Sequence, residues 1–323
     1  MEERQARVER ITIPRPKGIT LPLFSQGTPG FFHLLDYGWS EGRPHLMIEK
    51  LEDSHGELIP SGEVSDLDPI GSETLEMTLS REAYCVGRWV GGKHMPCPYL
   101  SRVVGESQCE RCLLEDIPDP SCIFEPHCWQ DPCGAHFCQA EHVVYLAIFG
   151  DRIKVGMTQN RRIEMRAIEQ GADGILPLML LGDRYSARTV ERSVSSILGI
   201  PQSIHTSVQI ESMMRAPSGE ELESDLLSTR EKVLDHWGDI VSMTSTYPGE
   251  VQVLKDPNDL DISIYYPEYP LPTPLPHIPK RNKGNIIRGE VVGAKGRFLI
   301  LISNSLIAHK MNEMIGKIAL VNE

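Results

Sequence analysis

The sequence predicts an α+β protein whose strand-rich ends flank a cysteine-rich segment and a mixed α/β unit. Short alternating or apolar stretches bounded by Gly, Ser, Pro and Asp indicate strands near both ends, and a strand–turn–strand pattern followed by helical periodicity lies between them. We therefore expect five regions: a β-rich N-terminal region (1–84), a cysteine-rich segment (85–141), an α/β domain (142–255), a proline-rich linker (256–282) and a C-terminal β module (283–323).

The N-terminal region reads as a small β scaffold. Strand-like stretches begin at His33, Pro44 and Thr74, and turn-forming residues separate them. No chemical motif accompanies these strands. In the cysteine-rich segment, by contrast, repeated prolines disfavour regular secondary structure.

The α/β domain opens with a predicted hairpin. Residues 142–149 and 152–157 form strand-like stretches, and Gly150-Asp151 is a turn signal between them. The helical and apolar patterns that follow predict further elements. These are a helix near 159–169 that ends at Gly171, a strand over 176–181, a helix capped by Ser186, and a helix over about 219–237.

The proline-rich linker carries six prolines between Pro267 and Pro279, a composition that favours an extended, semi-rigid conformation. The preferred interpretation is that this segment is a spacer. The alternative is that it is a binding motif for a partner protein that recognises proline-rich segments. Beyond the linker, residues 286–292 and 297–303 read as two strands around Gly293-Ala-Lys-Gly.

Composition predicts a soluble, cytoplasmic protein without membrane association. Hydrophobic residues make up 40% of the chain, and no apolar stretch is long enough to cross a bilayer. The N-terminus is charged and lacks an apolar core, so we expect no secretory signal. In a reducing compartment, clustered cysteines are more often metal ligands than disulfides.

Eight cysteines fall within 54 residues, and the rest of the chain has none. Zinc takes four thiolates in a tetrahedron, and a C-x-x-C pair such as Cys109–Cys112 presents two sulfurs from one tight turn. We expect two closed, structural zinc sites that brace a segment poor in apolar residues. The preferred division is sequential, with Cys85, Cys97, Cys109 and Cys112 in one site and Cys122, Cys128, Cys133 and Cys138 in the other.

Other arrangements of the cysteines stay open. The two sets can interleave, and a nearby histidine can replace a cysteine. Free thiols and an iron–sulfur cluster are chemical alternatives to zinc. The histidines close enough to serve are His94, His127, His136 and His142.

Residues 142–200 resemble the GIY-YIG nuclease superfamily. Val144-Tyr145-Leu146 followed by Lys154-Val155-Gly156 is similar to its paired strands, and the basic helix and Glu191 fit the same layout. Most of the chain also resembles an uncharacterised, mainly archaeal family known as domain of unknown function 2797. In that family a cysteine-rich segment precedes stretches seen here as VYLAIFG, IKVGMT and IEQGA.

The nuclease resemblance implies a site at which Tyr145 faces the substrate, Glu191 binds Mg²⁺, and Arg162 or Arg166 contacts phosphate. A divalent ion and a guanidinium would stabilise the negative charge that develops during phosphodiester cleavage. Lys154 replaces the tyrosine of the second motif, and lysine binds phosphate but activates water poorly. Whether the protein is an enzyme is therefore left open.

Each of these residues also has a structural interpretation. Tyr145 can be a half-buried strand residue, Glu191 a solvated flank of its helix, and Lys154 the solvent side of a hairpin. Arg162 and Arg166 can pair with Glu164 or Glu169 on the helix surface.

Charge is distributed unevenly along an acidic chain. The net charge is −13, which disfavours indiscriminate binding to nucleic acid. Residues 152–166 nevertheless carry five basic side chains against one acidic, and residues 280–297 carry six against one. Such segments can hold an anionic ligand locally.

Three functions follow from these observations. The favoured one is a zinc-containing protein that binds DNA or RNA through a degenerate GIY-YIG-like module. The second is an active endonuclease that uses Glu191 and Mg²⁺. The third is a protein-interaction scaffold that uses the proline-rich linker and the acidic surface and does not bind nucleic acid.

Overall fold

The computed structural model describes most of the chain from Gly30 onward. No helix in the described part is long and apolar enough to cross a membrane. The described residues are 13–14, 30–54, 57–90, 93–116, 122, 125–126, 136–260, 263–282 and 284–321, with the side chains of 13, 14, 116, 136 and 137 excluded.

Strands from the two ends of the chain form one sheet of eleven strands. Its order is β1-β4-β3-β2-β17-β5-β14-β15-β16-β13, with β8 beside β5. The two regions that the sequence analysis treats as separate β modules thus share a sheet, because β17 pairs with both β2 and β5. The strands are β1 (Ile13–Pro14), β2 (Gly30–Ser40), β3 (Arg43–Ser54), β4 (Glu57–Leu67), β5 (Thr74–Tyr84), β8 (Arg102–Val103), β13 (Lys280–Arg281), β14 (Ile286–Lys295), β15 (Phe298–Ile302), β16 (Leu306–Lys310) and β17 (Lys317–Val321).

A second sheet of four strands forms the α/β unit, in the order β10-β9-β11-β12. The predicted hairpin is confirmed as β9 and β10, and the predicted glycine cap is confirmed at Gly171, which ends α3 with φ 75°. The elements are β9 (His142–Phe149), β10 (Arg152–Gln159), α3 (Ile163–Gln170), β11 (Gly174–Leu181), α4 (Arg184–Leu198), α5 (Thr206–Ser212), α6 (Gly219–Asp235), α7 (Trp237–Thr244) and β12 (Val253–Lys255).

The predicted N-terminal cap of α4 is wrong. The side chain of Asp183 caps this helix, and it accepts the backbone N–H of Ser186 at 2.8 Å. Ser186 therefore lies inside the first turn, and its hydroxyl donates to the same carboxylate at 2.7 Å. Both residue types favour the cap position, so the choice between them depended on where the helix begins.

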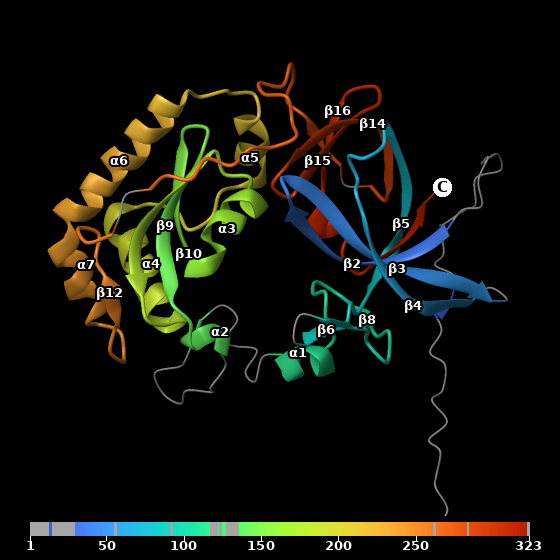
Figure 1. The fold of residues 1–323 in the computed structure, drawn as a ribbon, viewed down its shortest axis with the longest axis horizontal. Coiled ribbons are helices and arrows are strands. Elements are labelled where there is room, and N and C mark those ends of the chain that lie inside the picture. Colours follow the sequence, from blue (N-terminus) through green and yellow to red (C-terminus); the bar gives the residue numbers. More distant parts are fainter. Residues whose placement is uncertain are drawn as a thin grey trace, which may run out of the picture.

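The central strand β9 is buried along its whole length because both of its faces are covered. Val144, Leu146 and Ile148 pack in the core that α4, α6 and α7 complete. On the other face, Tyr145 and its neighbours pack against Ala167 of α3. Figure 1 shows that α3 and α5 lie on the side of the α/β unit that faces the large sheet.

The two units make close contact where α3 ends. Gly296, in the turn between β14 and β15, packs against Gly171, so a Cβ on Gly296 would lie 2.4 Å from the Gly171 nitrogen. The indole of Trp39 donates to the Gly296 carbonyl oxygen at 2.9 Å, and the buried ammonium of Lys295 pairs with Asp173. These contacts fix the position of the α/β unit against the large sheet.

The proline-rich segment packs against both units. Tyr265 exchanges two backbone hydrogen bonds of 3.0 Å with Ile175 of β11. Further along, Leu271 and Leu275 are buried in a core shared with α5 and the large sheet. The segment therefore joins the two units as part of their packing, and it does not act as an extended spacer.

Candidate functional site

The structure brings together the four cysteines of the first predicted set. The ligand atoms of Cys85, Cys97, Cys109 and Cys112 all lie within 4.8 Å of one another, and no disulfide joins them. Four sulfurs around one zinc ion lie about 3.8 Å apart, because each Zn–S bond is about 2.3 Å long. The sulfurs of Cys97 and Cys109 are 3.9 Å apart. This cluster could hold a metal ion such as zinc.

Three short elements present these cysteines. Cys85 directly follows β5, and Cys97 follows a small hairpin of β6 (Arg88–Val90) and β7 (Lys93–Met95). Cys109 and Cys112 lie at the start of α1 (Glu110–Asp116), a helix that the sequence analysis did not predict. One helical turn thus presents the C-x-x-C pair.

Backbone amides point at the sulfur of Cys85. The N–H groups of Cys109 and Gly87 donate to it at 3.1 and 3.4 Å. Donors of this kind favour the thiolate form. Gly87 has φ +82°, and a Cβ there would lie 2.2 Å from the Met95 carbonyl oxygen, so this turn requires glycine.

The cysteine cluster is attached to the large sheet through β8, which pairs with the end of β5. The backbone N–H of Cys85 also donates to the Ser101 carbonyl oxygen at 2.8 Å, and that of Val86 donates to Ser107 at 2.9 Å. The loops that present the sulfurs are therefore extensions of the sheet.

Three of the thiols differ in pKa, namely Cys85, Cys97 and Cys112. A hydrogen bond from Cys85 lowers the pKa of Cys97 to about 4, whereas the bond to Cys97 and burial raise the pKa of Cys85. Burial raises the pKa of Cys112 to about 12. A bound divalent ion would replace these protons, because thiolates are the form that binds metal.

The second predicted set is only partly visible, because Cys128 and Cys133 lie outside the described residues. Cys122 and Cys138 both contact Arg184 of α4. Its guanidinium donates to the Cys122 carbonyl oxygen at 2.7 Å and to the Cys138 sulfur at 3.9 Å. The second zinc site therefore remains a prediction.

None of the predicted substitute histidines belongs to the described cluster. His94 bonds the Val86 carbonyl oxygen through Nε2 at 2.5 Å, and His142 bonds that of Ala140 through Nδ1 at 2.7 Å. His127 and the side chain of His136 lie outside the described residues.

Tyr145, Lys154 and Arg166 form one group in the α/β unit. Tyr145 is buried on β9, its hydroxyl accepts a bond of 2.7 Å from Gln170, and it also contacts Arg166. The ammonium of Lys154 lies 6.0 Å from the centre of the Tyr145 ring. Burial lowers the pKa of Lys154 to about 8; the charge of Arg166 acts in the same direction, and Glu191 opposes it.

Arg162 and Arg166 share a carboxylate. Arg162 donates to Glu169 at 2.8 Å and Arg166 donates to it at 3.4 Å, as one of the structural interpretations predicts. Both side chains remain about half exposed, at 52% for Arg162 and 44% for Arg166. They are therefore accessible to an anion despite this pairing.

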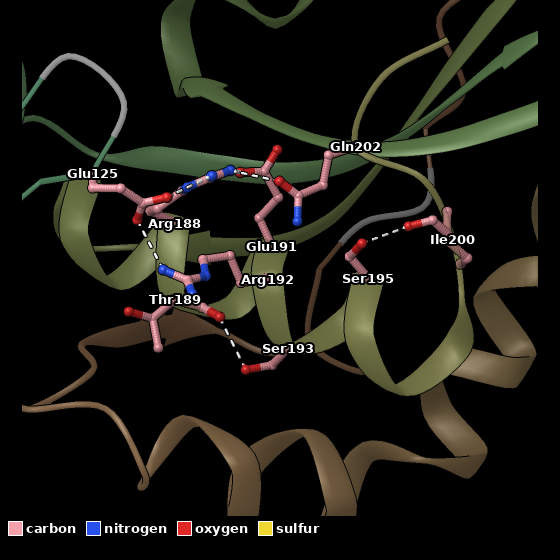
Figure 2. Close-up of polar contacts among 9 residues, drawn as sticks. All are labelled: Glu125, Arg188, Thr189, Glu191, Arg192, Ser193, Ser195, Ile200 and Gln202. Atoms are coloured by element: carbon pink, nitrogen blue, oxygen red, sulfur yellow. Dashed lines mark hydrogen bonds and ion pairs between the residues drawn. The ribbon is translucent and has the colours of Figure 1, made fainter.

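Glu191 is buried and already paired, so it is not a solvated flank of α4. Arg188, one turn earlier on α4, donates to its carboxylate at 2.7 Å and to the Gln202 amide oxygen at 2.8 Å (Figure 2). Burial raises the pKa of Glu191, whereas the Arg188 pairing acts against that rise.

Arg188 and its partner Glu125 of the cysteine-rich segment were not predicted from the sequence. Glu125 accepts from Arg188 at 3.0 Å and from Arg192 at 2.9 Å (Figure 2). The spacing of Arg188 and Glu191, three residues apart on a predicted helix, was a usable signal for their pairing. The contact with Glu125 joins distant segments and left no local signal.

A comparison with protein families identifies the chain. A family model described as "Protein of unknown function (DUF2797)" matches residues 72–314. The chain belongs to this family. Searches of curated proteins and of solved structures found no match. The family match spans the cysteine cluster, the α/β unit and most of the C-terminal strands of the large sheet.

The cysteine cluster predicts a measurable metal content. We expect Cys109→Ser to bind one zinc equivalent less per chain than the wild type, because three thiolates do not close a four-sulfur site. Elemental analysis of purified protein checks this. Ser107→Ala is the control, because its backbone carbonyl and not its side chain supports the cluster. Equal metal content in Cys109→Ser and the wild type would rule out this site.

Two glycines with the same backbone angle allow a matched test of the Cys85 turn. Gly87 and Gly105 both have φ +82°, but a Cβ on Gly105 meets nothing within 4 Å. Gly105→Ala should cost about 1 kcal/mol of stability from the backbone angle alone. Gly87→Ala adds a backbone clash, so roughly 3 kcal/mol and reduced metal retention are expected. Denaturant unfolding measures both, and equal losses would contradict this account of the turn.

Proposed function

We propose that this protein binds nucleic acid through a degenerate GIY-YIG-like unit that does not cleave it, with zinc in the cysteine cluster as a structural element. The observation that carries the proposal is the pairing of Glu191 with Arg188 at 2.7 Å. In the nuclease interpretation, Glu191 would have to bind Mg²⁺. A guanidinium in contact with that carboxylate supplies a fixed positive charge where the metal would supply one.

A magnesium ion needs near-octahedral oxygen ligands and usually keeps several water molecules. Glu191 is buried, and Arg188 and Gln202 occupy the polar positions beside it. Glu125 holds Arg188 from the opposite side. Binding of Mg²⁺ would therefore require an ion pair to open and buried groups to be rehydrated, which disfavours the endonuclease alternative.

Phosphate binding, by contrast, uses groups that stay available. Arg166 is half exposed and contacts the hydroxyl of Tyr145, and the Lys154 ammonium lies over the same ring. A guanidinium and an ammonium on one side of the sheet suit the oxygens of a phosphodiester. Nucleic acid presents phosphodiesters in a row, so several phosphate contacts can offset the repulsion from the acidic remainder of the chain.

The third function, a scaffold that uses the proline-rich segment, finds less support. A proline-reading partner needs an extended ligand with exposed side chains. Leu271 and Leu275 of this segment are buried, at 7% and 2% exposure. Their release would expose part of the core between α5 and the large sheet.

The binding proposal predicts a loss of affinity when Arg166 is neutralised. We expect Arg166→Gln to weaken binding of a fluorescent oligonucleotide roughly tenfold, because a hydrogen bond to a charged group is lost. Fluorescence anisotropy at low salt measures this, with DNA and RNA in parallel. Arg152→Gln is the control, since Arg152 is exposed and pairs with Asp151 at the far end of the hairpin.

The same samples test for catalysis. With Mg²⁺ or Mn²⁺ added, the oligonucleotide should remain intact. Cleavage by the wild type that Glu191→Ala abolishes would establish the endonuclease alternative. If the wild type binds neither DNA nor RNA at low salt, nucleic-acid binding is wrong.

Lys154 gives the binding a pH dependence. Its pKa is lowered to about 8, so the ammonium is charged below pH 8 and neutral above it. Affinity should fall roughly tenfold between pH 7 and pH 9 as this charge disappears. Lys154→Arg should remove the dependence and keep the affinity, because guanidinium stays charged. A wild-type profile as flat as that of Lys154→Arg would exclude Lys154 from the site.

A further inference from the structure

We propose that Arg297 of the large sheet forms, with Lys154 and Arg166 of the α/β unit, a phosphate-binding junction for nucleic acid. This inference rests on the proposed function and adds that the large sheet takes part in binding. Arg297 lies in the turn between β14 and β15, well outside residues 142–200, the segment that resembles the nucleases.

The backbone of this turn is fixed relative to α3, the helix that carries Arg166. Gly296, immediately before Arg297, packs against Gly171 at the end of that helix. On the other side of the turn, Lys295 forms its buried pair with Asp173. Arg297 therefore belongs to the large sheet but has a set position beside the α/β unit.

The side chain of Arg297 reaches across the interface. Its guanidinium donates to the Gln209 amide oxygen of α5 at 2.6 Å. The Nε atom is buried and has no hydrogen-bond partner among the described residues. Buried polar groups are normally satisfied, and an arginine uses parallel N–H groups to bind phosphate oxygens. Among the described residues, the guanidinium of Arg297 thus has a neutral partner in Gln209 and a buried Nε donor without a partner.

Like charges meet at this point. Burial lowers the pKa of Arg297, and the charges of Arg281 and Arg166 lower it further, whereas Tyr37 and Glu313 oppose the change. Arg166 and Arg297 both act on Lys154 in the same direction. Each of these three cations, drawn from two units, thus feels the charge of another, and an anion between them would reduce this repulsion.

The acids nearby are already shared. Glu169 pairs with both Arg162 and Arg166. Glu191 is paired with Arg188, and Glu313 pairs with Arg281 and Lys310. Burial and the charge of Glu169 raise the pKa of Asp36.

A phosphodiester fits this junction better than a carboxylate. Its oxygens accept from several donors at once, and the donors here come from different elements: β10, α3 and the β14–β15 turn. Burial raises the pKa of the neighbouring Tyr37 phenol, and the charges of Arg297 and Arg166 act against that rise. Aromatic side chains beside a basic surface suit single-stranded nucleic acid, whose bases stack on them.

The test compares Arg297→Gln with Arg288→Gln by fluorescence anisotropy on single-stranded DNA and RNA. Arg288 lies on β14 with 71% of its side chain exposed and pairs with Glu76, so its removal leaves the junction intact. We expect Arg297→Gln to weaken binding about tenfold and to reduce the salt slope by about 1. Arg288→Gln should bind within about twofold of the wild type.

Arg297→Lys is a conservative variant that controls for misfolding. Lysine keeps the positive charge, but its single ammonium lacks the parallel N–H groups of the guanidinium. It should bind with an affinity between those of the wild type and Arg297→Gln. Binding by the wild type that neither Arg297 variant changes would overturn the junction and leave the proposed function standing. Absence of binding by the wild type would overturn both.

Discussion

Four thiols held within 4.8 Å of one another, three of them buried, cannot all ionise without a cation among them. The surrounding backbone is nevertheless arranged for thiolates, with N–H groups of Gly87 and Cys109 aimed at Cys85. A divalent ion would resolve this conflict, because it would stabilise every thiolate at once. The turn at Gly87, the start of α1 and the pairing of β8 with β5 are the local structures that bring the sulfurs together.

The cysteine-rich segment contacts both units of the molecule. Its first half extends the large sheet through β8, and its second half reaches α4, where Glu125 pairs with Arg188 and Arg192. Figure 1 shows α1 and α2 (His136–Gln139) at the same end of the molecule, one below each unit. The segment therefore acts structurally at two places, and one of them is the charged network around Glu191.

How much of the fold and of the candidate site could be predicted depends on how far apart in sequence the interacting residues lie. The hairpin of β9 and β10 and the cap at Gly171 follow from residues close in sequence, and both predictions are confirmed. The grouping of Cys85, Cys97, Cys109 and Cys112 followed from ligand chemistry and sequential order. The insertion of β17 between β2 and β5 joins residues more than two hundred positions apart, and no local pattern carries that information.

The same limit explains what was missed at the candidate site. The resemblance to GIY-YIG nucleases pointed to Tyr145, Lys154, Arg162, Arg166 and Glu191. Several of the partners that define their chemistry come from elsewhere in the chain. Glu125 approaches α4 from the cysteine-rich segment, and the β14–β15 turn approaches α3 from the large sheet. A sequence motif identifies side chains that can react. Ion pairs with distant segments then determine which of these side chains are available to a ligand.

Ion pairs divide the charged side chains of the α/β unit into two neighbouring groups. Around Glu191, two carboxylates and two guanidinium groups neutralise one another, with Glu191 buried and Glu125 and Arg192 partly exposed. Around Tyr145, the cations outnumber the carboxylates that pair with them, and the guanidinium groups of Arg162 and Arg166 reach solvent. At the first place an anionic ligand would have to displace an existing partner, whereas at the second it would meet cations that outnumber their carboxylate partners.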